Sequence, residues 1–143
     1  MRIRPAVTGD HRALSAIDTI AVSEPKRRDE IASWIDQGQC HLVEIDGVVA
    51  AYGVFTRHFF GHAFIEMLMV GPDHRRRGLG AALIAYFQAM AAREKLFSST
   101  NLSNRAMQAL FVKSGFKLSG AIDNLDENDP EVVFYCAPRP GKA

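Results

Sequence analysis

The chain has 143 residues, of which 48% are hydrophobic and 23% are charged. This length and composition are typical of one globular domain, so we expect residues 1–143 to form a single domain. The formal net charge of +1 gives the chain no overall attraction for nucleic acid or for a membrane surface, and we expect neither as a partner.

Targeting signals and cysteines limit the compartment. The first residues lead into polar sequence without an apolar signal segment, and no run approaches the ~18 apolar residues of a membrane span. We therefore expect a cytoplasmic protein. Cys40 and Cys136 fit reduced thiols better than a disulfide framework.

The N-terminal part predicts a strand followed by two helices. Residues 2–6 are expected to form the strand, and residues 8–10 (Thr-Gly-Asp) are cap candidates for the first helix. Two sets of apolar residues at helical spacing mark the helices: Leu14, Ile17 and Ala21, then Ile31, Trp34 and Ile35. The second helix should end near Gly38, with Trp34 as an anchor of the core.

A β-hairpin is expected next. Asp46-Gly47 lies between residues 40–45 and 48–56, and this is the strongest hairpin signal in the chain. Residues 57–62 are expected to form a loop, and residues 63–70 a buried strand.

The C-terminal half alternates strands and helices. One helical face is marked by Leu79, Ala82, Leu83, Tyr86, Phe87 and Met90, and a second by Met107, Leu110, Phe111 and Ser114. Short strands are expected at residues 97–100, 116–119 and 132–136, the last two separated by an acidic loop. Strands first and then alternating strands and helices predict a mixed sheet flanked by helices. Residues 138–143 should be a frayed tail.

Residues 70–80, which we call the arginine turn, join the buried strand to the long helix. Gly78 and Gly80 lack a Cβ, so an anion can lie directly on backbone N–H groups that the first helical turn leaves unpaired. Arg75, Arg76 and Arg77 add donors and positive charge. A diphosphate-bearing cofactor is the natural occupant, although a solvated basic helix start would leave the same pattern. Neither a Walker loop nor a dinucleotide fingerprint matches the spacing.

Two motifs resemble those of a known family. Arg75-x-x-Gly78-x-Gly80, preceded by Val70-x-Pro72, resembles the acyl-CoA signature of the GNAT superfamily of N-acetyltransferases. The segment from Asn104 to Phe116 resembles the second signature of that family. The resemblance covers residues 2–137. It implies an α/β fold of the GNAT acyl-CoA N-acyltransferase type, with an α+β mixed sheet that is mostly antiparallel, splayed parallel strands and about four flanking helices.

The resemblance also implies how acetyl-CoA would bind. The cofactor diphosphate would lie on Arg75, Arg76, Arg77, Gly78, Leu79 and Gly80, and the pantetheine arm on the backbone of Leu68, Met69 and Val70. Asn104 would hydrogen-bond the pantetheine or phosphate region, and its alternative role is a plain helix N-cap. A backbone N–H near Met69 could stabilise an oxyanion. No metal is expected.

The implied reaction moves an acetyl group from acetyl-CoA to a primary amine of a small molecule or peptide. Glu66 is a candidate base, acting through water, although an acid in a sheet can also be salt-bridged or solvated. Ser99 stands where other family members carry a glutamate, which closes that route. Phe111 stands at the position of the usual proton-donating tyrosine and cannot donate. The alternative is therefore a CoA-binding regulatory or partner module with weak or no catalysis.

Other candidate sites have simpler explanations. Cys136 has no histidine placed by sequence to activate it, so a small apolar residue in a strand is favoured. His58 and His62 fit a loop better than a metal site. The acidic residues 123–131 form either a solvated turn or a pocket rim that attracts cationic amines. A homodimer is possible on the resemblance, whereas nucleic-acid binding through the arginines is weakly supported.

Overall fold

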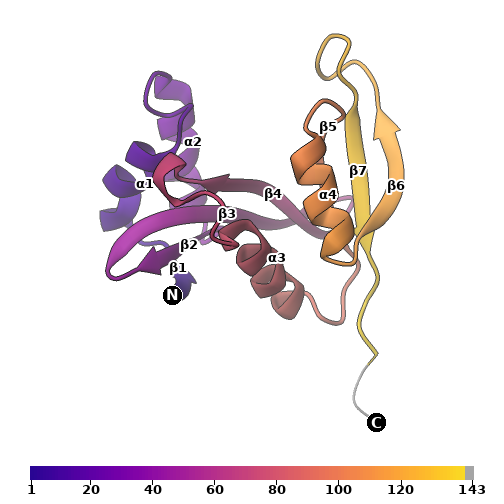
Figure 1. Ribbon diagram of the computed structural model, residues 1–143, viewed down its shortest axis with the longest axis horizontal. Coiled ribbons are helices and arrows are strands. Elements are labelled where there is room, and N and C mark those ends of the chain that lie inside the picture. Colours follow the sequence, from indigo (N-terminus) through magenta and orange to yellow (C-terminus); the bar gives the residue numbers. More distant parts are fainter. Residues whose placement is uncertain (141–143) are drawn as a thin grey trace. The chain divides into compact units, whose positions relative to one another are not determined.

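The computed structural model describes residues 1–140 of the chain (Figure 1). Within them, seven strands form a sheet in the order β1-β2-β3-β4-β5-β7-β6. The described chain divides into two compact units. Unit 1 comprises Met1–Phe55 and Met67–Tyr86, and unit 2 comprises Thr56–Glu66 and the chain from Phe87 onward.

Unit 1 contains the first helices and the first hairpin. Its elements are β1 (Arg2–Pro5), α1 (His11–Ile17), α2 (Pro25–Asp36), β2 (Cys40–Ile45), most of β3 (Val48–Phe59), the end of β4 (His62–Val70) and most of α3 (Leu79–Met90). Asp46 and Gly47 have φ of 52° and 77°, as a type I′ hairpin turn requires, so the predicted hairpin is confirmed.

The helices of unit 1 bury apolar side chains against the sheet. The core cluster contains Ala6, Leu14, Ala21, Ile31, Trp34, Ile35, Cys40, Leu42, Tyr52 and Val54. Trp34, 9% exposed, is therefore part of the core as predicted. Helix α2 begins at Pro25, earlier than its apolar residues suggested, because proline is favoured in the first helical turn and residues 26–30 supply its polar face.

Asp18 is the buried charge of unit 1. Its side chain is fully buried, and its carboxylate accepts hydrogen bonds from Arg27 Nη1 (3.1 Å), Tyr52 Oη (2.5 Å) and the backbone N–H groups of Ile20 and Ala21. Burial alone would raise the pKa of Asp18, but these hydrogen bonds outweigh it and hold the pKa below its ordinary value. The network ties the turn after α1 to both α2 and β3.

Asp10, one of the predicted cap candidates, holds the N-cap position of α1, but its side chain makes no capping hydrogen bond to that helix. Residues 8–10 form a 3₁₀ turn, and the Asp10 carboxylate accepts hydrogen bonds from Arg4 and from the N–H of Val7. Helix α1 ends at Ile17, so Ala21 lies in the following turn, although it is buried. A nearby arginine thus engages the carboxylate that was expected to cap the helix.

Unit 2 contains the later strands and the second signature. Its elements are the β3–β4 hairpin end, β5 (Leu96–Asn101), α4 (Arg105–Lys113), β6 (Lys117–Ile122) and β7 (Glu131–Cys136). Strand β4 pairs with β5 in parallel through Ala63–Ile65 and Leu96–Ser98, and β5 and β6 both pair with β7 antiparallel. The predicted mixed sheet is confirmed.

The prediction of a loop at residues 57–62 is wrong. Strand β3 continues to Phe59 and β4 starts at His62, which leaves Phe60 and Gly61 as a two-residue turn with φ of 52° and 79°. The Phe59 ring lies 4.8 Å from that of Phe64 and 5.1 Å from that of Phe97. These contacts between aromatic rings explain why the ladder extends through polar sequence.

Helix α4 lies alongside β7 in unit 2 (Figure 1). Its Phe111 ring, 1% exposed, is 5.3 Å from the rings of Phe116 and Phe134. In the described part of the chain, no helix is long and apolar enough to cross a membrane. The tail prediction for residues 138–143 lies partly outside the described residues; the Arg139 N–H donates to Ala92 O at 2.7 Å.

Candidate functional site

The arginine turn lies in unit 1 between β4 and α3. A 3₁₀ turn (Pro72–His74) follows Gly71, whose N–H donates to Ala50 O at 2.8 Å. A Cβ at Gly71 would lie 3.1 Å from that oxygen and 3.2 Å from Ile17 Cβ. The close approach explains the glycine and fixes where the turn begins.

The backbone of the turn takes unusual conformations. Arg76 has φ of 64° and Gly78 has φ of 75°. A left-handed non-glycine residue costs about 1 kcal/mol or more. The first helical hydrogen bond of α3 runs from Ala82 N–H to Gly78 O (3.0 Å), so the N–H groups of Leu79, Gly80 and Ala81 precede it. Such N–H groups carry the positive end of the helix dipole.

The arginines of the turn are available to a ligand. Arg75, Arg76 and Arg77 are all exposed, and their side chains make no hydrogen bond or ion pair with the described part of the chain. Open space surrounds the position of a Cβ at Gly78. His74, which the sequence analysis did not single out, has a buried Nδ1 without a partner among residues 1–140. Exposed guanidinium groups and an open glycine fit a phosphate-bearing ligand.

Leu68, Met69 and Val70 form the end of β4 in unit 1, just before the arginine turn. All three are half-buried, and Met69 packs against the core cluster together with Met67. They lie beyond the residues of β4 that pair with β5. The binding of a cofactor arm and the oxyanion role at Met69 remain predictions.

Unit 2 holds the other predicted residues. Asn104 caps α4, because its Oδ1 accepts the Met107 N–H at 3.1 Å. Its N-cap role is confirmed, and its cofactor role stays a prediction. The Phe111 side chain is buried against other rings. Glu66 is exposed, directly follows Ile65 at the end of the β4–β5 pairing, and has no ion pair in the described chain. It is thus an accessible carboxylate.

The sequence analysis missed a contact at Ser99. The Ser99 hydroxyl donates to Glu131 Oε2 at 2.7 Å, so a carboxylate from β7 reaches the position on β5 where only a hydroxyl was expected. The preceding residue, Ser98, donates to Ile65 O at 2.8 Å and marks the end of the β4–β5 pairing. No local pattern reveals a pair separated by this length of chain; only the pairing of β5 with β7 does.

The acidic loop is attached to the end of β5. Asn101 Nδ2 donates to Asp126 Oδ2 (2.8 Å), and the Ser103 hydroxyl donates to Asp129 Oδ2 (2.6 Å). The loop is therefore more ordered than a freely solvated turn. Among residues 1–140, no three His, Cys, Asp or Glu side chains gather closely enough to hold a metal ion.

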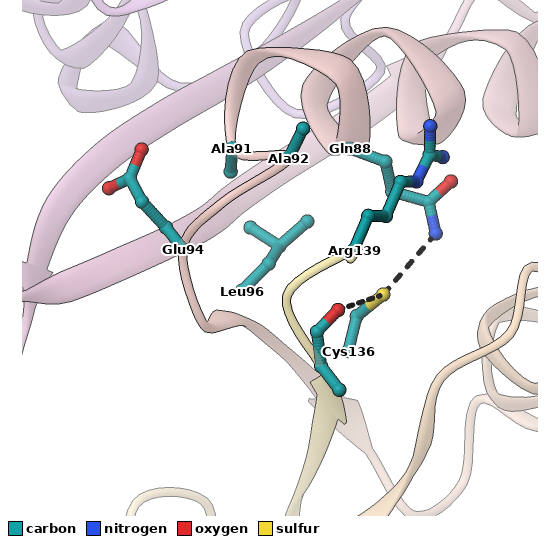
Figure 2. A pocket seen from close by; sticks show the side chains of 8 residues that line it. Gln88, Ala91, Ala92, Glu94, Leu96, Cys136 and Arg139 are labelled. Atoms are coloured by element: carbon teal, nitrogen blue, oxygen red, sulfur yellow. Dashed lines mark hydrogen bonds between the residues drawn. The ribbon is translucent and has the colours of Figure 1, made fainter. Parts of the chain in front are cut away.

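Cys136 borders a small pocket of unit 2 with a volume of about 10 Å³, roughly the space of one water. Figure 2 shows its sulfur facing the Gln88 amide, with Sγ 3.6 Å from Gln88 Nε2 and 3.9 Å from Ala137 O. No histidine lines the pocket. Both cysteines are free thiols, and burial raises the pKa of Cys40 to about 12. A nucleophilic cysteine is not supported.

The sequence matches the acetyltransferase (GNAT) family over residues 10–116. The chain therefore belongs to the GNAT family and is an N-acetyltransferase of that type. A GNAT-family acetyltransferase from Bacillus cereus shares 34% identity and superposes with a TM-score of 0.86, over 97% of this chain and 98% of that one. No curated protein matches the chain in sequence.

Two more distant structures share the fold. Ribosomal-protein-S18-alanine N-acetyltransferase from Escherichia coli is 22% identical, with a TM-score of 0.76 over 99% of this chain and 96% of that one. A putative acetyltransferase from Salmonella typhimurium, solved with its cofactor acetyl-CoA, is 21% identical, with a TM-score of 0.76 over 100% and 96%. The predicted family and fold are confirmed.

Proposed function

We propose that this protein transfers an acetyl group from acetyl-CoA to a primary amine of a small molecule or peptide. The observation that carries the proposal is the arginine turn, with three exposed arginines and a left-handed Gly78 at the start of α3. A structural neighbour was solved with acetyl-CoA as its cofactor, which supports the same cofactor here.

The cofactor would be held by backbone as much as by side chains. Arg75, Arg76 and Arg77 would neutralise the diphosphate, and the N–H groups at Gly78, Leu79 and Gly80 would donate to its oxygens. Leu68, Met69 and Val70 would bind the pantetheine arm through their main chain. The Asn104 side chain uses its oxygen in the N-cap hydrogen bond, so its amide NH₂ would be available to the cofactor. Phe111 was also predicted as a cofactor contact, but its ring is buried against Phe116 and Phe134, so its exposure gives that contact no support.

Acetyl-CoA supplies an activated acyl group, and the protein must remove a proton from the acceptor ammonium to give a neutral amine. A lysine-like ammonium has a pKa near 10.4, so it needs a base at neutral pH. Glu66 would accept that proton through a water molecule, and its exposure leaves room for one. The N–H near Met69 would stabilise the negative charge that develops on the carbonyl oxygen. A thiolate with a pKa near 8.5 can leave without a proton donor, so Phe111 does not prevent transfer.

The reaction is tested by thiol release against a panel of amines. We expect acetyl-CoA-dependent release with at least one primary amine, and a Glu66→Gln variant that loses roughly 100-fold in kcat/KM near neutral pH and recovers as the pH rises. Superimposable pH profiles for the two proteins would remove Glu66 as the base.

The competing function is a CoA-binding regulatory or partner module with little catalysis. It is favoured by one observation, the buried phenylalanine at position 111, which lacks the hydroxyl that could protonate a leaving thiolate. Binding of acetyl-CoA without release of thiol for any amine in the panel would select this function instead.

A further inference from the structure

The two faces of β7 in unit 2 carry different side chains. Helix α4 packs on the Phe134 side of β7, as the 5.3 Å separation of the Phe111 and Phe134 rings shows. Side chains alternate along a strand, so Tyr135, Val133 and Glu131 point to the opposite side. The β5–β7 register places Phe97 opposite Tyr135 and Ser99 opposite Val133. Phe97, Ser99 and Glu131 are all half-buried.

Aromatic rings line part of this face. The aromatic row consists of Phe59, Phe64, Phe97 and Tyr135, with ring centroids 4.8 Å apart for Phe59 and Phe64 and 5.1 Å apart for Phe97 and Tyr135. The strand registers place Phe64 opposite Phe97 and Tyr135 opposite Lys117. The Lys117 ammonium already lies 5.7 Å from the centre of the Tyr135 ring. The row therefore offers apolar contact and π-faces that tolerate a neighbouring cation.

Glu131 and Asp129 are two half-buried carboxylates that accept a serine hydroxyl and have no arginine partner in the described chain, and of the two only Glu131 lies in a strand. Asp10, Asp18 and Glu94 each pair with an arginine. Glu131 has no cationic partner in the described chain, and its hydrogen bond to the neutral Ser99 hydroxyl holds its Oε2. Its position in a strand and this hydrogen bond restrict its rotamers. An oriented carboxylate without a counter-ion is ready to accept N–H bonds from a cation.

The pair also lies near the candidate base. The last residues paired between β4 and β5 are Ile65 and Ser98. Glu66 and Ser99 are the next residues of these two strands. Unit 2 therefore has two carboxylates with different surroundings. Glu66 is exposed beside the end of the β4–β5 pairing, and Glu131 is hydrogen-bonded to Ser99. The hydrogen-bonded Glu131 suits a role in binding, and the exposed Glu66 suits a role in proton transfer.

We propose that Ser99 and Glu131 bind the ammonium group of the acceptor and that the aromatic row contacts its carbon stem. This inference rests on the proposed function and deepens it. The ammonium donates one N–H to Glu131 and one to the Ser99 oxygen, and its third proton passes through a water molecule to Glu66, so the neutral amine stays in place. The acceptor class is a cationic primary amine with an apolar stem. A carboxylate close to the amine, as in a free amino acid, is repelled by Glu131.

Butylguanidine tests the binding step without the chemistry, because a guanidinium stays charged and is not deprotonated. Titration of the full-length protein, followed by NMR, is expected to show weaker binding to Glu131→Gln by roughly 10- to 100-fold, since hydrogen bonds to charged groups are the strong ones. Ser99→Ala should lose about threefold. Methylguanidine, which lacks the stem, should bind more weakly than butylguanidine to the wild-type protein.

Asp126→Asn is the matched control, because it also neutralises a carboxylate hydrogen-bonded to β5, and it should change the affinity less than about twofold. Thermal melting establishes that each variant is folded. Equal binding of butylguanidine by wild type and Glu131→Gln would overturn the inference, and so would equal losses in Glu131→Gln and Asp126→Asn.

Kinetics separate this inference from the proposed function. With a primary alkylamine, Glu131→Gln should raise the KM for the amine by about tenfold or more and leave kcat and the KM for acetyl-CoA nearly unchanged. A lower kcat with an unchanged KM would contradict a binding role. Glu131-dependent guanidine binding without turnover of any amine would support the site and reject the acetyl transfer.

Discussion

The arginine turn of unit 1 and the Ser99–Glu131 pair of unit 2 carry opposite charges and are built in different ways. The turn takes its charge from three successive exposed arginines and from N–H groups at the start of α3. The pair takes its charge from a carboxylate that the β5–β7 register brings to a serine. The proposed anion site therefore comes from contiguous sequence, whereas the proposed cation site needs residues from two strands.

Within unit 1, Arg27 and Arg75 show how burial changes the use of an arginine. The Arg27 side chain is 13% exposed, is paired with Asp18 and lies 5.9 Å from the centre of the Trp34 ring. Arg75 is exposed and makes no such pair in the described chain. Arg27 supports the fold, whereas Arg75 is proposed to bind a ligand, so the removal of each should have different consequences.

The largest effect is expected from Asp18→Ala. This change leaves the largely buried Arg27 side chain with only the exposed Glu30 as an ion-pair partner and removes the acceptor of the buried Tyr52 hydroxyl. Breaking a buried pair costs about 3 to 5 kcal/mol, so we expect a loss of about 3 kcal/mol here. Urea unfolding should show the loss as a lower midpoint with an unchanged slope. Asp29→Ala, which removes an exposed acid of α2, should cost little. A loss below about 1 kcal/mol for Asp18→Ala would mean that the network does not hold unit 1 together.

The same carboxylate predicts a pH dependence of stability. The pKa of Asp18 is held below its ordinary value in the folded protein, so its contribution is fully present above the unfolded pKa near 3.9 and is lost as the pH falls through the folded value. Unfolding free energy measured between about pH 5 and pH 3 should fall more steeply for the wild type than for Asp18→Asn. Parallel curves would contradict this assignment.

A somewhat smaller effect, on binding alone, is expected from Arg75→Ala combined with Gly80→Asp. The first change removes a charge-assisted donor, and the second places a carboxylate where a phosphate would lie. Affinity for acetyl-CoA should fall by about 100-fold or more, which corresponds to about 2.7 kcal/mol. Isothermal titration calorimetry measures this affinity. Arg12→Asp changes the net charge equally on an exposed part of α1 and should leave affinity nearly unchanged; unaltered affinity in the double variant would disprove the diphosphate site.

The smallest effect concerns Asn104, whose two proposed roles can be separated. Asn104→Ala removes the N-cap acceptor of α4 and should cost about 1 kcal/mol of stability. Asn104→Ser keeps a cap acceptor, so it should retain most of the stability and still lose the amide NH₂ offered to the cofactor. A several-fold weaker acetyl-CoA affinity in the serine variant is expected, and equal affinity with wild type would reduce Asn104 to a capping residue.

Sequence patterns located most elements but not their ends. The Asp46-Gly47 hairpin, the apolar face of α3 and the Asn104 cap depend on residues close in the chain, and each is present. The expected loop at residues 57–62 is a two-residue turn instead, because rings from β3, β4 and β5 contact one another. Polar turn-like sequence was outweighed by packing that no local window contains.

The sequence by itself determined the family, the mixed sheet and the position of the arginine turn, because glycine conformation, helix capping and runs of charge act over a few residues. Only the tertiary structure decided which charges are engaged. In the folded chain, the buried Asp18 pairs with Arg27, Arg75 is exposed, and Glu131 accepts a hydrogen bond from Ser99. Charge pairing depends on distance and burial, and for residues far apart in the chain these are set by the fold.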